Sequence, residues 1–304
     1  MNESDLFGYS FNDEQKTAVY CLLHFIKENF NKNFPINFNR VPNTDEIIKS
    51  IEKNEVEAYE VYMSKYPRFL LYGSAGTGKT SLIIYIIFAS WLNNLAQNDS
   101  VKFIVGAPTN KAKEVLINKF EQLTDTLLKL LKNNPAYKEL VDKDKLVDIK
   151  EKISKNIQFK TLSQILGINL QITAKGDEEF TKGNIQKIMF KYRDIKSFLI
   201  IDECSMIDKN SLFKTQLISR PIIFLGDYCQ LPPVNESNSM LFRIIDGLEK
   251  GKDHGFQMVQ LSQVMRSNNG VIDCCCDLRN LIIAQCDHQK ITPININENI
   301  CVLP

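Results

Sequence analysis

The segment "GSAGTGKT" (residues 73–80) has the residue types and the spacing of a phosphate-binding loop. Gly73 and Gly78 enclose four residues, and Lys79 and Thr80 follow directly. Glycines allow backbone N–H groups to turn around phosphate oxygens, and a helix beginning near Lys79 would aim its positive end at the same place. We therefore predict that Lys79 reaches the β- and γ-phosphates of a nucleotide and that Thr80 offers its hydroxyl to Mg²⁺. The residues predicted to bind the phosphates are Gly73, Ser74, Ala75, Gly76, Thr77, Gly78, Lys79 and Thr80.

A second cluster, "LIIDECSM" (residues 199–206), supplies the acidic partners that such a loop needs. Asp202 would hold the metal ion, and Glu203 would orient and deprotonate an attacking water. Two adjacent acids can also simply cap a helix. Their place after an apolar run, downstream of a phosphate loop, favours catalysis, and a glutamate base beside the metal acid favours hydrolysis over transfer to a small molecule.

Short apolar runs stand directly before these clusters and before two further polar ones. Near-continuous apolar runs of this length are typical of strands covered on both faces of a parallel sheet. Helical patterns at 81–92 and 113–131 lie between the runs, so the alternation predicts an α/β doubly wound sheet. Ligands bind beyond the carboxyl ends of such strands, where all four clusters would lie. The four runs are 68–72, 101–106, 197–201 and 221–225.

The overall composition limits the classes of partner. Net charge is +1, from 37 basic and 36 acidic residues, so binding to nucleic acid would need a local patch. No apolar run is long enough to span a bilayer, and the acidic N-terminus is not a secretory signal. Eight cysteines without a CxxC pair suggest reduced thiols. We therefore expect a soluble intracellular protein of cytoplasm or nucleoid without a membrane partner, and frequent Asn, Lys and Ile hint at a viral, AT-rich genome.

The order of the motifs resembles that of superfamily 1B DNA helicases, especially the Dda and RecD-like enzymes. The resemblance spans residues 11 to 280 and implies a RecA-like P-loop NTPase that binds ATP and Mg²⁺. The segments that carry it, besides "GSAGTGKT" and "DECSM", are "FNDEQKTAV" (11–19), "GAPTNKAKEVL" (106–116), "TLSQILGI" (161–168), "GDYCQLPPV" (226–234) and "LSQVMRSNNGVIDCCCDLRN" (261–280).

The resemblance also implies roles for nucleotide-contacting residues outside the phosphate loop. Gln15 would recognise the adenine edge, and Gln230 would sense the γ-phosphate from a loop stiffened by Pro232 and Pro233. Arg266 would act as an arginine finger. The alternatives are a rigid structural turn for the loop and a surface position for Arg266.

The same resemblance implies a track for single-stranded DNA and a wedge at the duplex fork. The residues expected to contact DNA are Pro108, Thr109, Asn110, Lys111, Thr161, Gln164 and Phe180. Thr161 could instead cap a helix, and Ser163 stands where the family often has a histidine. An alternating pattern around a "KGDE" turn predicts a hairpin within residues 169–190. Phe180 is expected at its tip, although an aromatic in a small hairpin is as often local core.

The resemblance implies a domain division as well. Residues 1–268 would form a first RecA-like domain, interrupted at about 121–195 by an inserted helical and hairpin subdomain. Residues 269–304 would lead into a second RecA-like domain, whose two later motifs are not found before Pro304. We therefore expect a missing second half, or a second polypeptide, to complete the motor.

Together these patterns predict an ATP-dependent DNA helicase, with a 5′-to-3′ direction implied by resemblance alone. One alternative is a DNA-binding ATPase half or remnant without unwinding activity. Another is a P-loop kinase or signalling NTPase unrelated to DNA. That alternative predicts turnover indifferent to single strands, and the segments "GAPTNK" and "GDYCQLPP" argue against it.

Overall fold

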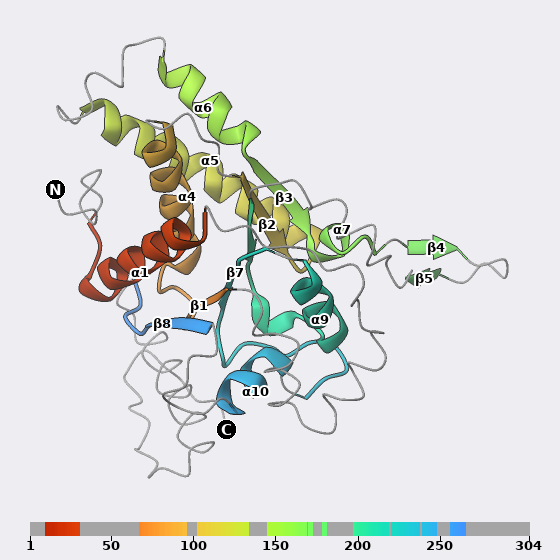
Figure 1. Cartoon of the computed structure of the whole chain (residues 1–304). Coiled ribbons are helices and arrows are strands. Elements are labelled where there is room, and N and C mark those ends of the chain that lie inside the picture. Colours follow the sequence, from red (N-terminus) through yellow and green to blue (C-terminus); the bar gives the residue numbers. More distant parts are fainter. Residues whose placement is uncertain are drawn as a thin grey trace, which may run out of the picture.

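A six-stranded, all-parallel sheet forms the centre of the protein (Figure 1). The computed structural model describes residues 10–30, 67–95, 102–133, 145–168, 170–172, 178–180, 197–218, 220–237, 239–247 and 256–265. The strand order across the sheet is β3-β2-β6-β7-β1-β8. The strands are β1 (Arg68–Gly73), β2 (Lys102–Ala107), β3 (Ile157–Thr161), β6 (Ser197–Ile201), β7 (Ile222–Gly226) and β8 (Phe256–Leu261).

The four central strands are those that the apolar runs predict. β1, β2, β6 and β7 lie within one residue of the expected ranges. The two strands at the edges, β3 and β8, were not expected. Their sequences, "IQFKT" and "FQMVQL", mix polar with apolar residues because an edge strand is only partly covered. The predicted α/β doubly wound, parallel class is therefore confirmed.

Helices cover both faces of this sheet. Alternate residues of each strand point to opposite faces, so Phe69 and Leu71 enter one apolar cluster while Leu70 enters the other. The first face is covered by α1 (Asp13–Phe30), α4 (Lys79–Leu95) and α5 (Asn110–Asn133). The second is covered by α7 (Leu162–Ile165), the 3₁₀ helix η4 (Cys204–Met206), α9 (Lys209–Leu217) and α10 (Met240–Gly247).

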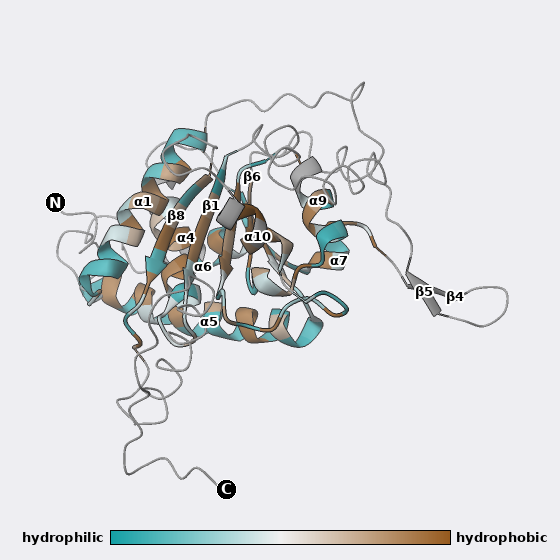
Figure 2. Ribbon diagram, turned by 90° about the horizontal axis from the view of Figure 1, so that it is seen from below, coloured by the Kyte–Doolittle hydropathy of each residue, from teal (hydrophilic) through white to brown (hydrophobic). Residues whose placement is uncertain are grey.

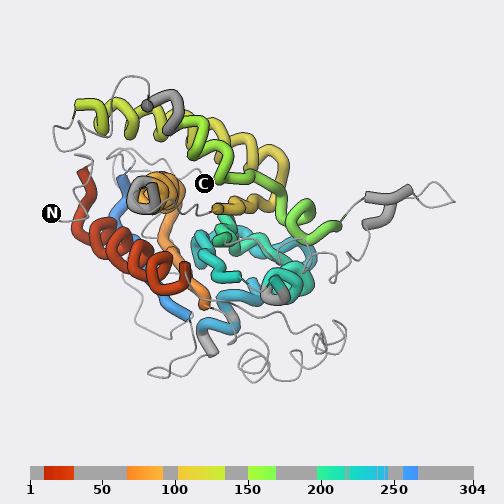
Figure 3. Tube along the Cα trace, turned by 45° about the horizontal axis from the view of Figure 1, so that its top comes forward, coloured from red at the N-terminus to blue at the C-terminus, as the bar shows by residue number. Residues whose placement is uncertain are grey.

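The figures show the resulting three layers from different directions. Figure 2 shows the hydrophobic strands between helices whose hydrophilic sides face outward. In Figure 3 the red, orange and yellow helices lie on one side of the strands, and the teal and blue ones lie on the other. Among the described residues no helix combines the length and the apolar character needed to cross a membrane.

The segment expected to be an insertion belongs partly to the main body. Its expected start near residue 121 falls inside α5, which buries Leu127 and Leu131 in the same cluster as α1 and α4. α6 (Lys145–Lys155) then leads into β3, a strand of the main sheet. The Phe120 ring of α5 packs 5.3 Å from the Phe159 ring of β3. The lysine-rich composition of this segment made its buried side hard to predict. In α5 only every third or fourth residue is buried, and the lysines lie on the rest of the helix surface.

The predicted hairpin is present, with a correction to the place of Phe180. β4 (Leu170–Ile172) and β5 (Glu178–Phe180) pair antiparallel and project from the body next to α7 (Figure 1). Ile172 pairs with Glu178 on the side of the turn, whereas Phe180 pairs with Leu170. Phe180 therefore lies at the base of the hairpin and not at its tip. The physical reason is that β5 runs from Glu178 to Phe180, so Phe180 is the residue of this strand that lies farthest from the turn.

Close packing at the end of β7 generates the first prediction. A Cβ atom on Gly226 would lie 2.4 Å from Cys204 Sγ, much closer than van der Waals contact allows. We expect Gly226→Ala to lower the free energy of unfolding by about 1–3 kcal/mol, the usual cost of overpacking a core. Cys204→Ala should relieve this cost, so that the double variant is more stable than the sum of the single effects by at least about 0.5 kcal/mol. Equilibrium unfolding in urea measures all three variants, and strict additivity would show that the two sites do not touch.

Candidate functional site

The strand order gathers the predicted chemical groups along one rim of the sheet. β6, β7 and β1 are adjacent, and they end respectively at the acidic pair, at the "GDYCQLPPV" loop and at the phosphate loop. β2 pairs with β6, β3 pairs with β2, and these two strands end at the two segments expected to contact DNA. Parallel pairing places all these ends at the same edge. The expected convergence of the strand ends is thus confirmed, with the groups expected to bind nucleotide in one block and those expected to meet DNA in the next.

The phosphate loop is held in shape by its own hydrogen bonds. Gly76 and Gly78 adopt φ angles of 87° and 88°, which other residues rarely take. Lys79 Nζ donates to the carbonyls of Gly73 at 2.6 Å and Ser74 at 3.0 Å. Burial lowers the pKa of Lys79, and the nearby Asp227, Glu203 and Asp202 act against that shift. The lysine is thus a partly buried cation that the loop carbonyls solvate.

Thr80 and Asp202 offer a pair of oxygens suited to a hard cation. Thr80 Oγ1 donates to Asp202 Oδ2 at 3.3 Å, and Asp202 Oδ1 accepts the N–H of Glu203 at 3.0 Å. Burial is the largest influence on Asp202 and raises the pKa of its carboxyl. No cluster of three or more His, Cys, Asp or Glu residues able to hold a metal occurs in the described part of the chain. Two protein oxygens agree with Mg²⁺, which usually completes its shell with water and substrate phosphates.

A chain of side chains links Glu203 to the loop after β7. The Gln230 side chain hydrogen-bonds Glu203, and Ser205 Oγ donates to Gln230 Oε1 at 3.4 Å. Since its oxygen is occupied by the Ser205 hydroxyl, the Gln230 amide presents its NH₂ group to the Glu203 carboxylate. Burial and Asp202 raise the pKa of Glu203, while Gln230 and Lys79 lower it. Ser205 is a member of this site that the motifs did not single out.

Asp227 is a second residue that the motif analysis left without a role. It is buried and shapes the turn, since its Oδ1 accepts the N–H of Cys229 at 3.1 Å and its carbonyl accepts the N–H of Gln230 at 3.2 Å. Its charge acts on Lys79 from the neighbouring strand. An Asp followed by a tight turn was the signal that could have identified it.

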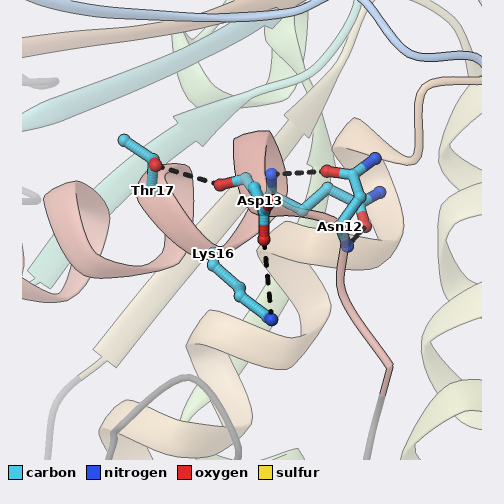
Figure 4. A network of polar contacts seen from close by, with 5 residues as sticks. Asn12, Asp13, Lys16 and Thr17 are labelled. Atoms are coloured by element: carbon cyan, nitrogen blue, oxygen red, sulfur yellow. Dashed lines mark hydrogen bonds and ion pairs between the residues drawn. The ribbon is translucent and has the colours of Figure 1, made fainter.

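The first turn of α1 packs directly against the phosphate loop. Asn12 and Gln15 cap the helix reciprocally, with Gln15 N donating to Asn12 Oδ1 at 2.8 Å and Asn12 N to Gln15 Oε1 at 3.2 Å. Gln15 Nε2 donates to the carbonyl of Thr77 at 3.0 Å. Figure 4 shows this turn, where Asp13 also pairs with Lys16 at 3.7 Å. The buried Gln15 amide thus bonds the loop, and its recognition of adenine stays a prediction.

The residues expected to contact DNA differ in what they present. Thr109, Asn110 and Lys111 are exposed at the start of α5, where Thr109 Oγ1 accepts the N–H of Ala112 at 3.1 Å, and Pro108 is half-buried. Thr161 is buried and forms a capping box with Gln164, as the capping alternative predicts. Gln164 is exposed. Arg266 and the side chain of Phe180 lie outside the described residues.

The two blocks of the rim share a backbone hydrogen bond. Asp202 N donates to the carbonyl of Gly106 at 2.9 Å. Gly106 precedes the segment expected to meet DNA by two residues. A Cβ on Gly106 would lie 2.7 Å from Ile165 Cδ1, so the glycine also lets α7 approach β2. The acid expected to bind the metal and the loop expected to meet DNA are therefore joined through the same backbone hydrogen-bond ladder.

Several known proteins are similar to this chain in sequence. Residues 57–236, more than half of the chain, match the family model described as AAA domain. The uncharacterized protein R530 of Acanthamoeba polyphaga mimivirus is 29% identical over 231 residues, covering 74% of this chain and 40% of that protein. The RecBCD enzyme subunit RecD of Buchnera aphidicola subsp. Schizaphis graminum is 35% identical over 184 residues, covering 59% and 25%. The ATP-dependent DNA helicase dda of Enterobacteria phage T4 is 29% identical over 212 residues, covering 68% and 37%.

These similarities confirm the resemblance to the Dda and RecD-like helicases of superfamily 1 that the motifs carry. The chain spans between a quarter and two fifths of the length of these three relatives. Two of the relatives belong to a virus and a bacteriophage, in keeping with the viral origin suggested by the composition.

Burial of Asp202 generates a prediction about pH. Its folded pKa is raised above the ordinary 3.8, so the folded protein binds this proton more tightly than the unfolded chain does. Stability is therefore lost as the pH rises through the folded pKa. The Asp202→Asn side chain keeps a polar partner for Glu203 N and for the Thr80 hydroxyl, but it carries no charge. Without nucleotide or divalent metal, we expect it to raise the free energy of unfolding at pH 8 by on the order of 1 kcal/mol.

This gain should shrink in acid, because both the folded and the unfolded carboxyl take up protons as the pH falls toward the ordinary pKa of 3.8. Urea unfolding at pH 8 and at pH 4 measures the two differences. A variant that is less stable than the wild type at pH 8 would contradict the assignment of burial as the dominant cause.

Proposed function

The chain belongs to the AAA domain family, and from this premise we propose that it is the ATP-hydrolysing motor part of a DNA helicase. One observation carries the proposal: the phosphate loop, the acids and Gln230 end three adjacent strands, and the segments expected to meet DNA end the next two. Single-stranded DNA and fork DNA would be the partners. The 5′-to-3′ direction follows from the resemblance alone.

The donor set of the rim fits ATP with Mg²⁺. Thr80 Oγ1 and Asp202 would hold the metal, and the loop N–H groups would surround the phosphates. Mg²⁺ in this place supplies neutralisation of the charge on the phosphate oxygens. Lys79 would exchange the carbonyls of Gly73 and Ser74 for phosphate oxygens, since both are acceptors for its ammonium group.

Glu203 would be the general base of hydrolysis. It is half-buried beside Asp202, and burial raises the pKa of its carboxyl, which suits a group that accepts a proton near neutral pH. One carboxylate oxygen would take the proton of the attacking water, while Gln230 holds the carboxylate by its NH₂ group. The residue adopts φ 53° and ψ 46°, a left-handed conformation that costs about 1 kcal/mol or more and is tolerated mainly at functional positions.

Gln230 would connect the state of the nucleotide to the DNA. Its side chain lies at Glu203, whereas the exit of its loop faces solvent, with Leu231 77% and Val234 84% exposed. One short loop therefore spans the base and the outer surface of the rim. A γ-phosphate that draws the amide away from Glu203 would shift the backbone that carries these exposed side chains.

A second RecA-like domain is part of this proposal. It would come from a longer form of the chain or from a second polypeptide, and the greater length of the relatives supports it. Residues 1–268 would form the first motor domain, with the β4–β5 hairpin as its wedge, and 269–304 would lead toward the second. Arg266 is proposed to meet the γ-phosphate, and the hydrogen bond from Met265 N to the carbonyl of Gly76, at 3.0 Å, supports this by connectivity.

The proposed chemistry predicts opposite behaviour for two variants. Lys79→Ala removes the cation from the phosphates, so we expect ATP binding to be lost and hydrolysis to fall at least about 100-fold. Glu203→Gln retains binding but removes the proton acceptor, so we expect turnover to fall about 10²–10⁴-fold. Lys102→Ala is the matched control, because this exposed lysine begins β2 at the opposite end of the sheet.

Hydrolysis with and without single-stranded DNA, measured beside unwinding of a forked duplex, tests the function itself. DNA-stimulated hydrolysis without unwinding would leave a DNA-dependent ATPase. Hydrolysis indifferent to DNA would refute the helicase proposal.

The coupling role of Gln230 predicts a different defect. Gln230→Ala should retain ATP binding within about threefold, while stimulation of hydrolysis by single-stranded DNA falls at least about tenfold, because Glu203 loses the side-chain hydrogen bond that joins it to the loop. Gln257→Ala, an exposed glutamine on β8, is the control. Titrating each variant with DNA at saturating ATP measures the effect, and normal stimulation in Gln230→Ala would remove the sensing argument.

A further inference from the structure

Glu14, in the first turn of α1, fastens a distant segment of the chain. Its carboxylate accepts the N–H of Ser262 at 2.8 Å, the N–H of Gln263 at 3.1 Å and the hydroxyl of Ser262. These hydrogen bonds lower the pKa of Glu14, with the Ser262 hydroxyl as the largest cause. The contact therefore favours the ionised form of Glu14. We call residues 262–265, which follow β8 directly, the strap.

The other end of the strap reaches the phosphate loop. Met265 N donates to the carbonyl of Gly76 at 3.0 Å. Asn12 Nδ2 contacts Met265 Sδ at 3.4 Å, so the start of α1 touches both ends of the strap. The Glu14 contacts therefore stand three residues along the chain from a hydrogen bond to the phosphate loop.

Two consecutive carbonyls of the loop are held from the outside in this way. The carbonyl of Gly76 is capped by the strap, and that of Thr77 is capped by Gln15 Nε2 at 3.0 Å. In a planar trans peptide the carbonyl and the following N–H point in opposite directions. Capping these carbonyls on the outside therefore turns the N–H groups of Thr77 and Gly78 inward. Thr77 N accordingly faces the carbonyl of Ser74, which also accepts Lys79 Nζ.

We propose that Glu14 is a positioning residue for phosphate binding, because it holds the strap that fixes the orientation of the Gly76–Thr77 peptide. The inference rests on the proposed function and adds a residue that lies 59 positions or more before the phosphate loop in the sequence. Glu14 touches no phosphate. It acts through Ser262, Met265 and Gly76, and it leaves the base-recognising amide of Gln15 bonded to Asn12 and Thr77.

Asp13 provides a matched control for the effect of charge. It is the neighbouring acid of the same first turn, fully exposed, and it pairs with Lys16 rather than the strap (Figure 4). Removing either acid weakens the interaction with the helix dipole to a similar extent. The difference between Glu14→Ala and Asp13→Ala therefore isolates the strap.

Nucleotide affinity separates a role at the phosphates from a role at the base. We expect Glu14→Ala to weaken binding of ATP and of GTP about tenfold each, by a common factor, because the triphosphate is shared. Asp13→Ala should stay within about twofold of the wild type. Glu14→Gln should stay within about threefold, since its carbonyl can accept both N–H groups and its NH₂ can donate to the Ser262 hydroxyl.

A double-mutant cycle tests the path through the strap. Ser262→Ala should weaken ATP binding about threefold in the wild type and have no further effect in Glu14→Ala. Equal affinities of Glu14→Ala and Asp13→Ala would overturn the inference, as would a loss confined to ATP, which would assign Glu14 to the base. Matching melting temperatures for the two alanine variants verify that the fold is retained. If these temperatures differ, Ser262→Ala takes the place of Glu14→Ala, and ATP binding that equals that of the wild type would then overturn the inference.

Lys79→Ala separates this inference from the proposed function. If the wild type and Lys79→Ala bind ATP equally poorly, the nucleotide site itself is refuted and the inference falls with it. If Lys79→Ala loses ATP while Glu14→Ala binds like Asp13→Ala, only the inference fails.

Discussion

Burial of opposite charges at the ends of three adjacent strands is the constraint on which the site depends. Lys79 faces Asp202, Glu203 and Asp227 in a place where burial lowers the pKa of the lysine and raises those of Asp202 and Glu203. Charges of this kind are tolerated only with partners and hydrogen bonds. The parallel sheet supplies both, because its apolar residues are covered on two faces and leave only the strand ends to polar groups.

This constraint explains why the glycines of the motifs are needed. Gly226 lets Cys204 approach the end of β7. A Cβ atom on Gly73 would lie 2.1 Å from the carbonyl oxygen of Leu261, so the glycine lets these two backbones come close together. The charged groups can be brought together only if the strands that carry them meet closely at their ends. Here the packing of the core and the geometry of the site are one requirement, so a substitution at these glycines would disturb both.

The central elements could be predicted because their signals are local. The runs that became β1, β2, β6 and β7 are continuous and apolar, and the phosphate loop has a fixed spacing. β3 and β8 have no continuous apolar run, because they are edge strands and are only partly covered. The buried side of α5 was concealed by exposed lysines, and the register that places Phe180 at the base depends on the turn. The contact of Glu14 with Ser262 joins residues 248 positions apart, and no local pattern announces a contact of that range.

The hydrogen-bond ladder gives a physical reason for the proposed chemistry and the proposed DNA contact to share one rim. Asp202 N is bonded to the carbonyl of Gly106, and Ala107 pairs with Thr161, the cap of α7. If a bound metal nucleotide moved Asp202, this hydrogen bond would be kept only if Gly106 moved with it. Residues 108–111 follow Gly106 closely in the chain and would then move too. The Gln230 loop offers a second connection from the other side of the acidic pair. Two rigid connections from one pair of acids would make the surface proposed to face DNA respond as a unit, because neither the strand ladder nor the proline-stiffened loop can absorb the movement alone.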